Sequence, residues 1–412
     1  MEQTERITFQ FYWFLYLLFA LLCSYAAFDF MTSANTSVRI GNRFGVHATL
    51  ISIVTVLGTY YIFTSLRAVI ISPVKFSLWI ITLWIAISTV YHSNYDWNTA
   101  IHFGLSCLWI LIYHFFSYYL RRYPEAIAQV RFNIGVMFCF YVFSAVYAMV
   151  FIHAHLVKVG QDRLAVVNLV YSVMVFVPWL SILKNRKQRL IGIAIVLLVV
   201  LGSMKRGAII AFPMMLSTWM LVEAAVERKN LLRPALKIIF SLLLFAVGLL
   251  VADQVSGGFL SDRFSARQLA DGSGRAGAFS LAFKDLSEWS FAELMLGTGK
   301  GFFSHNDWFE FLYLYGIIGV ILYASLFCSI FFRGWQLIRK SSQYAPAVAM
   351  TLVYTLLVGM FGAIYFVHST LYLMALLGTV EALTANDNRR VALELVELSR
   401  KDGKAICNLQ VS

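Results

Sequence analysis

The chain has few charged residues for its length. Only 13% of its 412 residues are Asp, Glu, Lys or Arg, whereas 60% are hydrophobic and the mean hydropathy is +0.74. A water-soluble domain of this length needs far more charge on its surface, so the composition excludes that class. We therefore expect an integral membrane protein.

Cysteine is also scarce. The five cysteines are scattered, without the short paired spacings of a metal site or a disulfide-rich domain: Cys23, Cys107, Cys139, Cys328 and Cys407. Neither a disulfide framework nor a metal site follows from them. A basic leader is absent too, because Glu2 and Glu5 are acidic, so we expect the first apolar run to remain as a helix.

Long apolar runs are what the sequence does contain. A run of about 20 apolar residues crosses a bilayer, and twelve runs approach that length: 10–29, 47–65, 75–92, 99–119, 132–152, 164–183, 190–204, 207–222, 236–252, 307–332, 345–363 and 367–384. The sequence therefore predicts an all-α polytopic membrane protein with about 12 transmembrane helices. We divide it into nine helices (1–252), one large loop (253–306), three helices (307–384) and a tail (385–412).

The positive charges set the orientation. If both termini are cytoplasmic, the inner segments hold 22 of the 33 Lys and Arg residues. The positive-inside rule favours this arrangement, which places the large loop outside. The net charge of +12 is thus explained by topology, and we expect no nucleic-acid partner.

Two cations stand out on the outer side. Apolar runs of only about 15 and 16 residues flank Lys205 and Arg206, and each reaches roughly 22 to 24 Å of the ~30 Å hydrocarbon core. We expect this turn to dip below the outer surface, to the depth of a lipid phosphate. Snorkelling to the interface is the alternative interpretation. Two adjacent outer cations run against the positive-inside bias, which favours a functional role.

The large loop carries further arginines. Arg263 and Arg275 lie in its first half, and the spacing of Phe279 and Phe283 predicts an amphipathic helix after Arg275. We expect the glycine-rich segment 297–301 to be a flexible turn. An ordered loop of this length on a membrane protein is usually functional.

His305 follows this loop, at the start of the apolar run 307–332. The positive end of a helix disfavours the imidazolium, so the ring should stay neutral and able to accept a proton. Asp307 and Glu310 are candidates to orient it. Gly316 and Gly319 are expected on one helical face, where a neighbouring helix can pack closely.

Together these residues suit a reaction with a diphosphate leaving group. One guanidinium group can bind two phosphate oxygens through two parallel hydrogen bonds, and it stays charged in any environment. Fixed cations stabilise the charge that grows on a departing diphosphate, while a neutral histidine takes the proton of an attacking sugar hydroxyl.

The same residues carry a family resemblance. His305-Asn306, nine residues, Gly316, two residues and Gly319 resemble the His-Asn-x9-Gly-x-x-Gly pattern of the O-antigen ligase family, which overlaps in sequence with O-antigen and exopolysaccharide polymerases. Further similarities are Lys205-Arg206-Gly207 before a helix with Phe212-Pro213, Asp262-Arg263-Phe264, and Arg275. The resemblance covers residues 190 to 384.

The resemblance implies a GT-C-like fold in the bacterial inner membrane, with the active site facing the periplasm. It implies that Arg206, Arg263 and Arg275 hold the diphosphate of an undecaprenyl diphosphate-linked glycan, and we place Lys205 and Asn306 beside them. His305 would be the general base of a metal-independent, inverting transfer to a lipid A-core sugar, with no cofactor. The expected partners are these two glycolipids and membrane lipids.

Two alternatives stay open. A polymerase would use the same chemistry but move the glycan onto another lipid-linked repeat unit. A transporter or flippase for lipid-linked sugars would bury ionisable residues near mid-membrane. The twelve runs contain almost none apart from His102, His114, Glu310 and Glu381, which favours an enzyme.

Overall fold

The computed structural model describes residues 72–92, 97–158, 169–228, 232–265, 275–300, 306–361 and 370–401. The predicted spans at 10–29 and 47–65 lie outside these residues, and so does His305.

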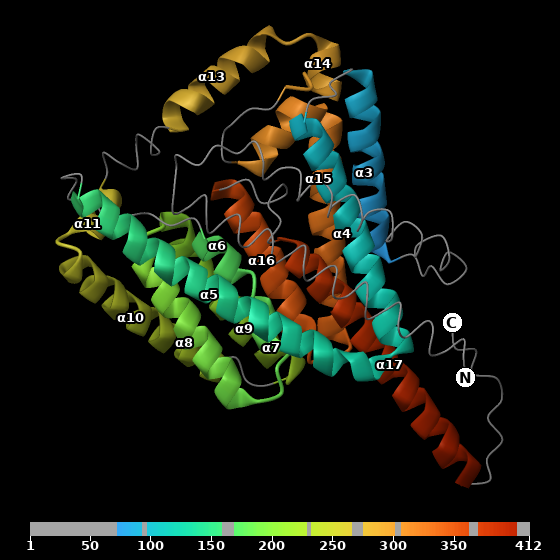
Figure 1. The fold of residues 1–412 in the computed structure, drawn as a ribbon. Coiled ribbons are helices and arrows are strands. Elements are labelled where there is room, and N and C mark those ends of the chain that lie inside the picture. Colours follow the sequence, from blue (N-terminus) through green and yellow to red (C-terminus); the bar gives the residue numbers. More distant parts are fainter. Residues whose placement is uncertain are drawn as a thin grey trace.

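Every regular element in the described ranges is a helix (Figure 1). The α-helices are α3 (Pro73–Tyr91), α4 (Trp97–Arg122), α5 (Ile127–Lys158), α6 (Leu169–Met174), α7 (Val177–Ser181), α8 (Arg186–Gly202), α9 (Arg206–Val226), α10 (Leu232–Val255), α11 (Phe259–Arg263), α13 (Arg275–Glu288), α14 (Phe291–Leu296), α15 (Asp307–Arg339), α16 (Ala345–Phe361) and α17 (Leu371–Lys401). Six of the described helices, α3, α4, α5, α9, α10 and α15, contain segments long and apolar enough to cross a membrane. The chain is thus a helical, multi-pass membrane protein, as its composition predicts.

Two predicted spans differ from the observed helices. The run 164–183 contains α6 and α7 rather than one helix, because Pro178 has no amide hydrogen and its ring would clash with the carbonyl of Met174. The helix that contains most of the run 367–384 is longer than that run: α17 continues to Lys401 through the predicted tail, since no proline interrupts it.

The helices pack in two connected groups. The first group contains α3, α4, α15 and α17, and the second group contains α5 to α10 (Figure 1). α16 connects them, because it packs against α15 of the first group and α9 of the second. The α4–α17 contact is close because of Gly378, where an added Cβ would lie 2.5 Å from the carbonyl oxygen of Tyr113. A small residue at such a contact lets two helix backbones approach.

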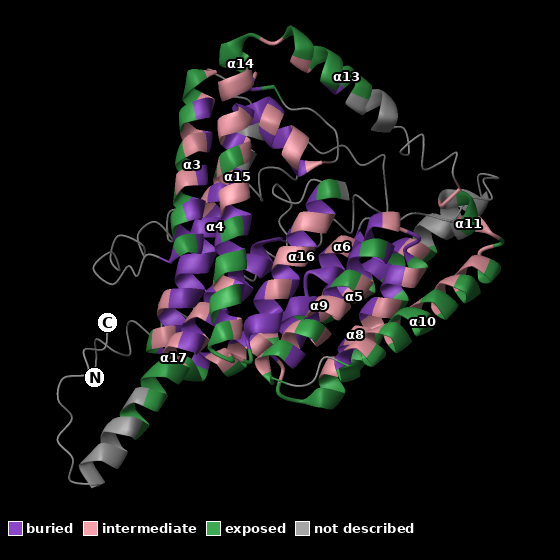
Figure 2. Cartoon of the chain, turned by 180° about the vertical axis from the view of Figure 1, so that it is seen from behind, coloured by how far each residue is buried: buried purple, intermediate pink, exposed green. Residues whose placement is uncertain are grey.

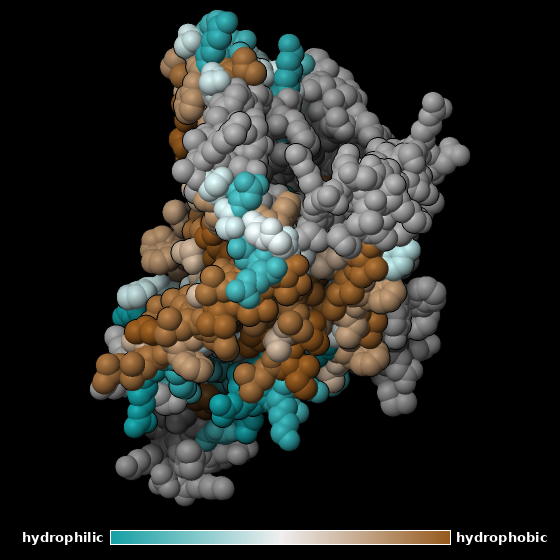
Figure 3. All heavy atoms as spheres, turned by 90° about the vertical axis from the view of Figure 1, so that its left-hand side faces the viewer, coloured by the Kyte–Doolittle hydropathy of each residue, from teal (hydrophilic) through white to brown (hydrophobic). Residues whose placement is uncertain are grey.

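α10 forms the edge of the second group (Figure 2). Its most apolar segment has no buried residue, whereas 78% of the corresponding segment of α4 is buried. The face seen in Figure 3 carries a broad band of apolar side chains with hydrophilic side chains on both sides of it. This distribution is the one expected for a surface in contact with lipid.

The two ends of the molecule are linked differently. At one end, His92 Nε2 on the C-terminal side of α3 lies 3.3 Å from the carbonyl oxygen of Leu296 in α14. At the other end, Arg121 of α4 and Arg333 of α15 both contact Glu381 of α17. The charge pattern predicts that the end with His92 is outer and the end with Glu381 is cytoplasmic, and this orientation stays a prediction.

Candidate functional site at the outer helix ends

Asn306 fixes the outer end of α15. Its side-chain oxygen accepts hydrogen bonds from the backbone amides of Trp308 (2.9 Å) and Phe309 (3.3 Å), so it is the N-cap. The helix therefore starts at Asp307, and His305 directly precedes the cap in sequence. The role of His305 as general base stays a prediction.

Asn306 also links α15 to α16. Its Nδ2 donates to the carbonyl oxygen of Met360, at 3.3 Å. We predicted that Asn306 binds substrate; these contacts give it a structural role at the helix end, and substrate contact stays a prediction.

The first turn of α15 contains two buried acids. Asp307 is fully buried, and its Oδ2 accepts a hydrogen bond of 2.9 Å from the hydroxyl of Tyr323. Glu310 is 8% exposed. Carboxylates are favoured near the positive end of a helix, and the tyrosine holds Asp307 in one position. Asp307 is therefore a fixed, buried acid at the start of α15, and its orienting role toward His305 stays a prediction.

Gly316 does not have the helical geometry that we predicted. Its φ of 66° and ψ of −169° break α15, so Gly316 and Gly319 do not share one face of a continuous helix. The missing side chain does allow close packing, but the partner is the end of α14. An added Cβ at Gly316 would collide with the carbonyl of Met295 and lie 2.5 Å from the amide nitrogen of Gly297.

The break at Gly316 frees carbonyl groups that a continuous helix would bond to its own amides. The oxygen of Tyr313 accepts from the amide nitrogen (2.8 Å) and the hydroxyl (3.2 Å) of Thr298. The oxygen of Leu314 accepts from Ser88 Oγ (3.4 Å), and that of Tyr315 from Trp84 Nε1 (3.1 Å). The kink is thus supported by α3 and by the segment after α14.

Sequence reasoning did not identify Trp84 and Ser88. The signal was present, because these polar side chains are four residues apart and so share one face of α3. Polar groups inside a membrane span need a partner within the protein.

α13 and α14 form an arch over the outer end of α15 (Figure 1). The hydroxyl of Tyr313 lies 3.2 Å from the carbonyl oxygen of Ala282 and 3.3 Å from Asp285 Oδ2, both in α13. The ring of Trp289 contacts the ring of Tyr313 edge to face, at 4.8 Å between centroids. The helix predicted after Arg275 is therefore present as α13, and it is docked on α15.

α14 starts with a capping box. Ser290 Oγ accepts from the amide of Glu293, while the Glu293 carboxylate accepts from the amide and hydroxyl of Ser290. These bonds favour the charged form and lower the pKa of Glu293. The segment after α14, which we expected to be flexible, is held to α15 through Thr298.

The Lys205-Arg206 turn lies against the second group of helices. Ser203 is fully buried and Met204 has a φ of 51°, a left-handed conformation that makes the turn tight. Lys205 Nζ lies over the ring of Tyr171, 5.8 Å from its centroid. Arg206 is the first residue of α9 and is partly buried.

α9 is longer than the apolar run 207–222 that the sequence predicts. α9 has 21 residues, about 31 Å at the rise of an α-helix, so it is long enough to cross the hydrocarbon core. α8 has 17 residues and begins with a polar turn. Of the two helices that flank the turn, only α8 is too short to cross the hydrocarbon core, because α9 extends past its apolar run. Only α8 therefore supports the expectation that the turn dips below the outer surface.

A series of contacts places the turn and Asn306 at the same end of the molecule. Lys205 contacts the ring of Tyr171, and the carbonyl oxygen of Tyr171 accepts from the hydroxyl of Tyr354 in α16, at 2.9 Å. Met360, the partner of Asn306, follows about 9 Å further along α16. The N-termini of α9 and α15 therefore open at one end, where both helix dipoles favour an anion.

The loop arginines are only partly placed. Arg263 is the last residue of α11, and Arg275 is the first residue of α13. Their side chains are outside the described set, as are residues 266–274 between them. Their convergence on His305 stays a prediction.

In the described ranges, no group of three or more His, Cys, Asp or Glu residues is arranged to hold a metal ion. Comparison with protein-family models finds no match, and comparison with curated proteins finds no similar sequence.

Proposed function

We propose that this protein is a glycosyltransferase that moves a polysaccharide from undecaprenyl diphosphate to a sugar of a lipid A-core acceptor. The observation that carries the proposal is that the N-termini of α9 and α15 open at the same end of the molecule. Lys205-Arg206 and Asn306 thus lie at the same end of the molecule, and we place His305, which precedes Asn306 in sequence, beside them.

The diphosphate of the donor binds at these helix ends. Lys205 and Arg206 supply positive charge, and the N-terminus of α9, which has no side-chain cap, adds partial positive charge. The amides of Trp308 and Phe309 in α15 are already bonded to Asn306, so α15 contributes only through its dipole. Because negative charge on the diphosphate grows as its bond to the sugar breaks, fixed cations stabilise the transition state more than the bound donor. Arg263 and Arg275 from the loop complete this binding site.

His305 acts as the general base. It takes the proton of the acceptor hydroxyl as that oxygen attacks the anomeric carbon from the face opposite the diphosphate. The bond from the anomeric carbon to the diphosphate oxygen breaks, undecaprenyl diphosphate leaves, and the configuration is inverted. Asp307, which Tyr323 holds in place, stabilises the protonated ring.

The proposal places the protein in the bacterial inner membrane with its site facing the periplasm. Lipid-linked glycans are amphipathic, so a site at the outer ends of membrane helices reaches both the diphosphate and the sugar. The arch of α13 and α14 lies where the glycan would extend.

The test is complementation of a strain that lacks the protein. Wild type, His305→Ala, Arg206→Ala and the control Arg233→Ala, an exposed residue at the other end, are compared for surface polysaccharide on gels and for membrane insertion. We expect wild type and control to attach long glycan to lipid A-core, and the two site variants to lose attachment by a factor of 100 or more, on the order expected for a lost base or charge clamp.

Other outcomes separate the alternatives. Core attachment that persists without the protein, with chains limited to one repeat unit, would identify a polymerase. Normal transfer by both site variants would mean that the proposed site is wrong and that a transporter must be reconsidered.

A further inference from the structure

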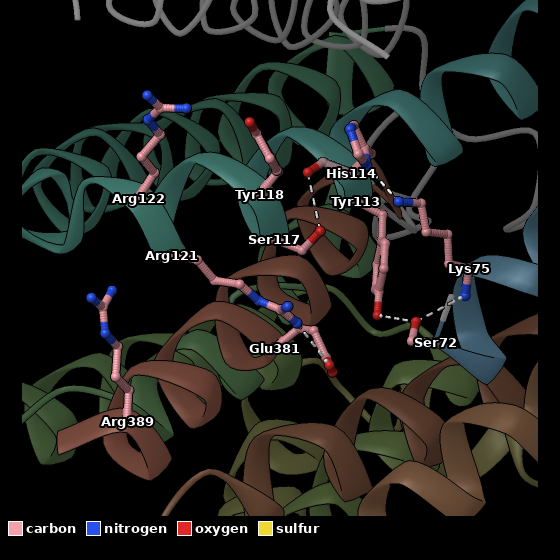
Figure 4. A pocket seen from close by; sticks show the side chains of 10 residues that line it. All are labelled: Ser72, Lys75, Tyr113, His114, Ser117, Tyr118, Arg121, Arg122, Glu381 and Arg389. Atoms are coloured by element: carbon pink, nitrogen blue, oxygen red, sulfur yellow. Dashed lines mark hydrogen bonds and ion pairs between the residues drawn. The ribbon is translucent and has the colours of Figure 1, made fainter. Parts of the chain in front are cut away.

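A second polar site lies at the opposite end of the molecule. It surrounds a cavity of about 400 Å³ among α3, α4 and α17 (Figure 4). This is the end that the charge pattern assigns to the cytoplasm, so the cavity is separate from the outer helix ends described above. Its volume is within the range of about 300 to 1,000 Å³ that is common for ligand sites.

The lining of the cavity is strongly basic. Lys75, Arg121, Arg122 and Arg389 line it, against the single carboxylate of Glu381. Figure 4 shows Arg122 and Arg389 toward one side of the cavity and Lys75 toward the other. Four cations around one small space repel one another unless an anion lies between them.

Glu381 cannot neutralise this charge by itself. Its Oε1 lies 3.1 Å from Arg121 Nη2, and its Oε2 lies 2.9 Å from Nε of Arg333, which approaches from α15. One negative charge is therefore shared by two guanidinium groups. The other three cations of the lining, Lys75, Arg122 and Arg389, remain in excess.

Lys75 is the most buried of these cations. It is 4% exposed, and its Nζ lies 2.5 Å from Nδ1 of His114. In its ammonium form Lys75 has no lone pair, so in that form it donates this bond and the neutral ring of His114 accepts it at Nδ1. Burial of an ammonium with a neutral partner is costly, and a bound anion would offset that cost.

Hydroxyl groups add neutral donors. Ser72 Oγ and the hydroxyl of Tyr113 are 2.8 Å apart, and Ser72 also caps α3 by accepting from the amide of Lys75. Ser117 lines the same wall, but its hydroxyl already donates to the carbonyl oxygen of His114, at 3.0 Å, so the donor for a ligand comes from the Ser72–Tyr113 pair. Guanidinium, ammonium and hydroxyl donors around one cavity are the groups that bind phosphate oxygens.

We propose that this inner cavity binds the phosphate group of an anionic ligand. Basic pockets between membrane helices on the cytoplasmic side are suited to the headgroups of anionic phospholipids, and a soluble phosphate would meet the same donors. Lys75 and Arg121 form the inner part of the site, and the exposed Arg122 and Arg389 form its entrance. The proposal does not depend on the glycosyltransferase activity.

The test uses the purified full chain and two probes. In one arm, thermal unfolding is compared in nanodiscs of phosphatidylcholine alone and of phosphatidylcholine with phosphatidylglycerol. In the other, inorganic phosphate is titrated against the protein in detergent. The variant Arg122→Gln with Arg389→Gln removes two exposed cations and should fold normally, while Arg390→Gln, next to the cavity but not part of it, is the control.

We expect phosphatidylglycerol to raise the unfolding temperature of wild type and of Arg390→Gln, and the double variant to lose most of this rise. Loss of two charge-assisted contacts should weaken binding by about tenfold or more. A response to inorganic phosphate alone, lost in the double variant, supports the same site with a soluble ligand. An equal response of double variant and control, or no response to either probe, would overturn the proposal.

Discussion

At the scale of single residues, Gly316 has a conformation that other residues rarely adopt. Its φ of 66° and ψ of −169° lie in a region that costs a residue with a side chain about 1 to 3 kcal/mol. An added Cβ would also meet the backbone of Met295 and Gly297. We expect Gly316→Ala to lower the unfolding temperature in detergent and to loosen the contact between α14 and α15.

Gly334 in the same helix gives a matched control. An added Cβ there would lie 3.6 Å from Val348 Cγ1, an ordinary contact, so Gly334→Ala should be neutral or stabilise by up to about 1 kcal/mol. If both variants unfold at the same temperature, the proposed strain at Gly316 is absent.

At the scale of one helix, Asn306 combines two functions that substitution can separate. Asn306→Ala removes the cap of α15 and the bond to Met360, and a lost cap costs about 0.5 to 2 kcal/mol. Asn306→Asp keeps an oxygen for the amides of Trp308 and Phe309 but removes the donor to α16. We expect faster hydrogen exchange at the start of α15 in the alanine variant only.

The comparison of these two variants also limits the interpretation of transfer assays. If the aspartate variant keeps the cap but loses transfer, Asn306 or its link to α16 contributes beyond helix capping. Equal exchange rates for alanine and wild type would contradict the capping role.

Sequence periodicity located most described helices well, because an apolar run of sufficient length has few alternatives in a membrane. It failed where a single residue changes the backbone: Pro178 divides the sixth predicted span, and Gly316 breaks α15. A glycine in an apolar helix indicates close packing from sequence, but the identity of the partner depends on the tertiary fold. From the sequence, the end of α14 could not be distinguished from a neighbouring membrane helix as the packing partner of Gly316.

At the scale of the whole molecule, Glu381 joins three helices. Its carboxylate contacts Arg121 of α4 and Arg333 of α15, and the three side chains are 13 to 22% exposed. Removal of one partner from a buried ion pair costs about 3 to 5 kcal/mol, because charges are left uncompensated. Because the three side chains are partly exposed, we expect Glu381→Gln to lower the free energy of unfolding by less than this amount, but by more than a surface pair would.

Glu394 provides the comparison for this variant. It pairs with Arg390 four residues away, both side chains are more than half exposed, and such a pair contributes only about 0.3 to 0.5 kcal/mol. Glu394→Gln should therefore have a small effect on the same unfolding measurement. A similar effect of the two substitutions would show that Glu381 is not a structural centre.

The contacts of Glu381 show why sites were harder to predict than helices. Arg121 and Glu381 are 260 residues apart, so no local pattern relates them. The outer residues Lys205, Arg206 and Asn306 could be singled out from the sequence because they interrupt apolar runs or form a spaced pattern, and their role in a site stays a prediction. His114 stood out as one of the few ionisable residues in the apolar runs, but its contact with Lys75 in one cavity depends on how α3 packs against α4.

The kink in α15 has a consequence for the order in which the chain is made. Carbonyl groups without partners are costly in hydrocarbon, so this helix could not enter a bilayer alone in its final shape. Each donor that satisfies them comes earlier in synthesis: Trp84 precedes Tyr315 by 231 residues, Ser88 precedes Leu314 by 226, and Thr298 precedes Tyr313 by 15. When the ribosome releases α15, its partners have already been synthesised, and the bent helix can form as it is inserted.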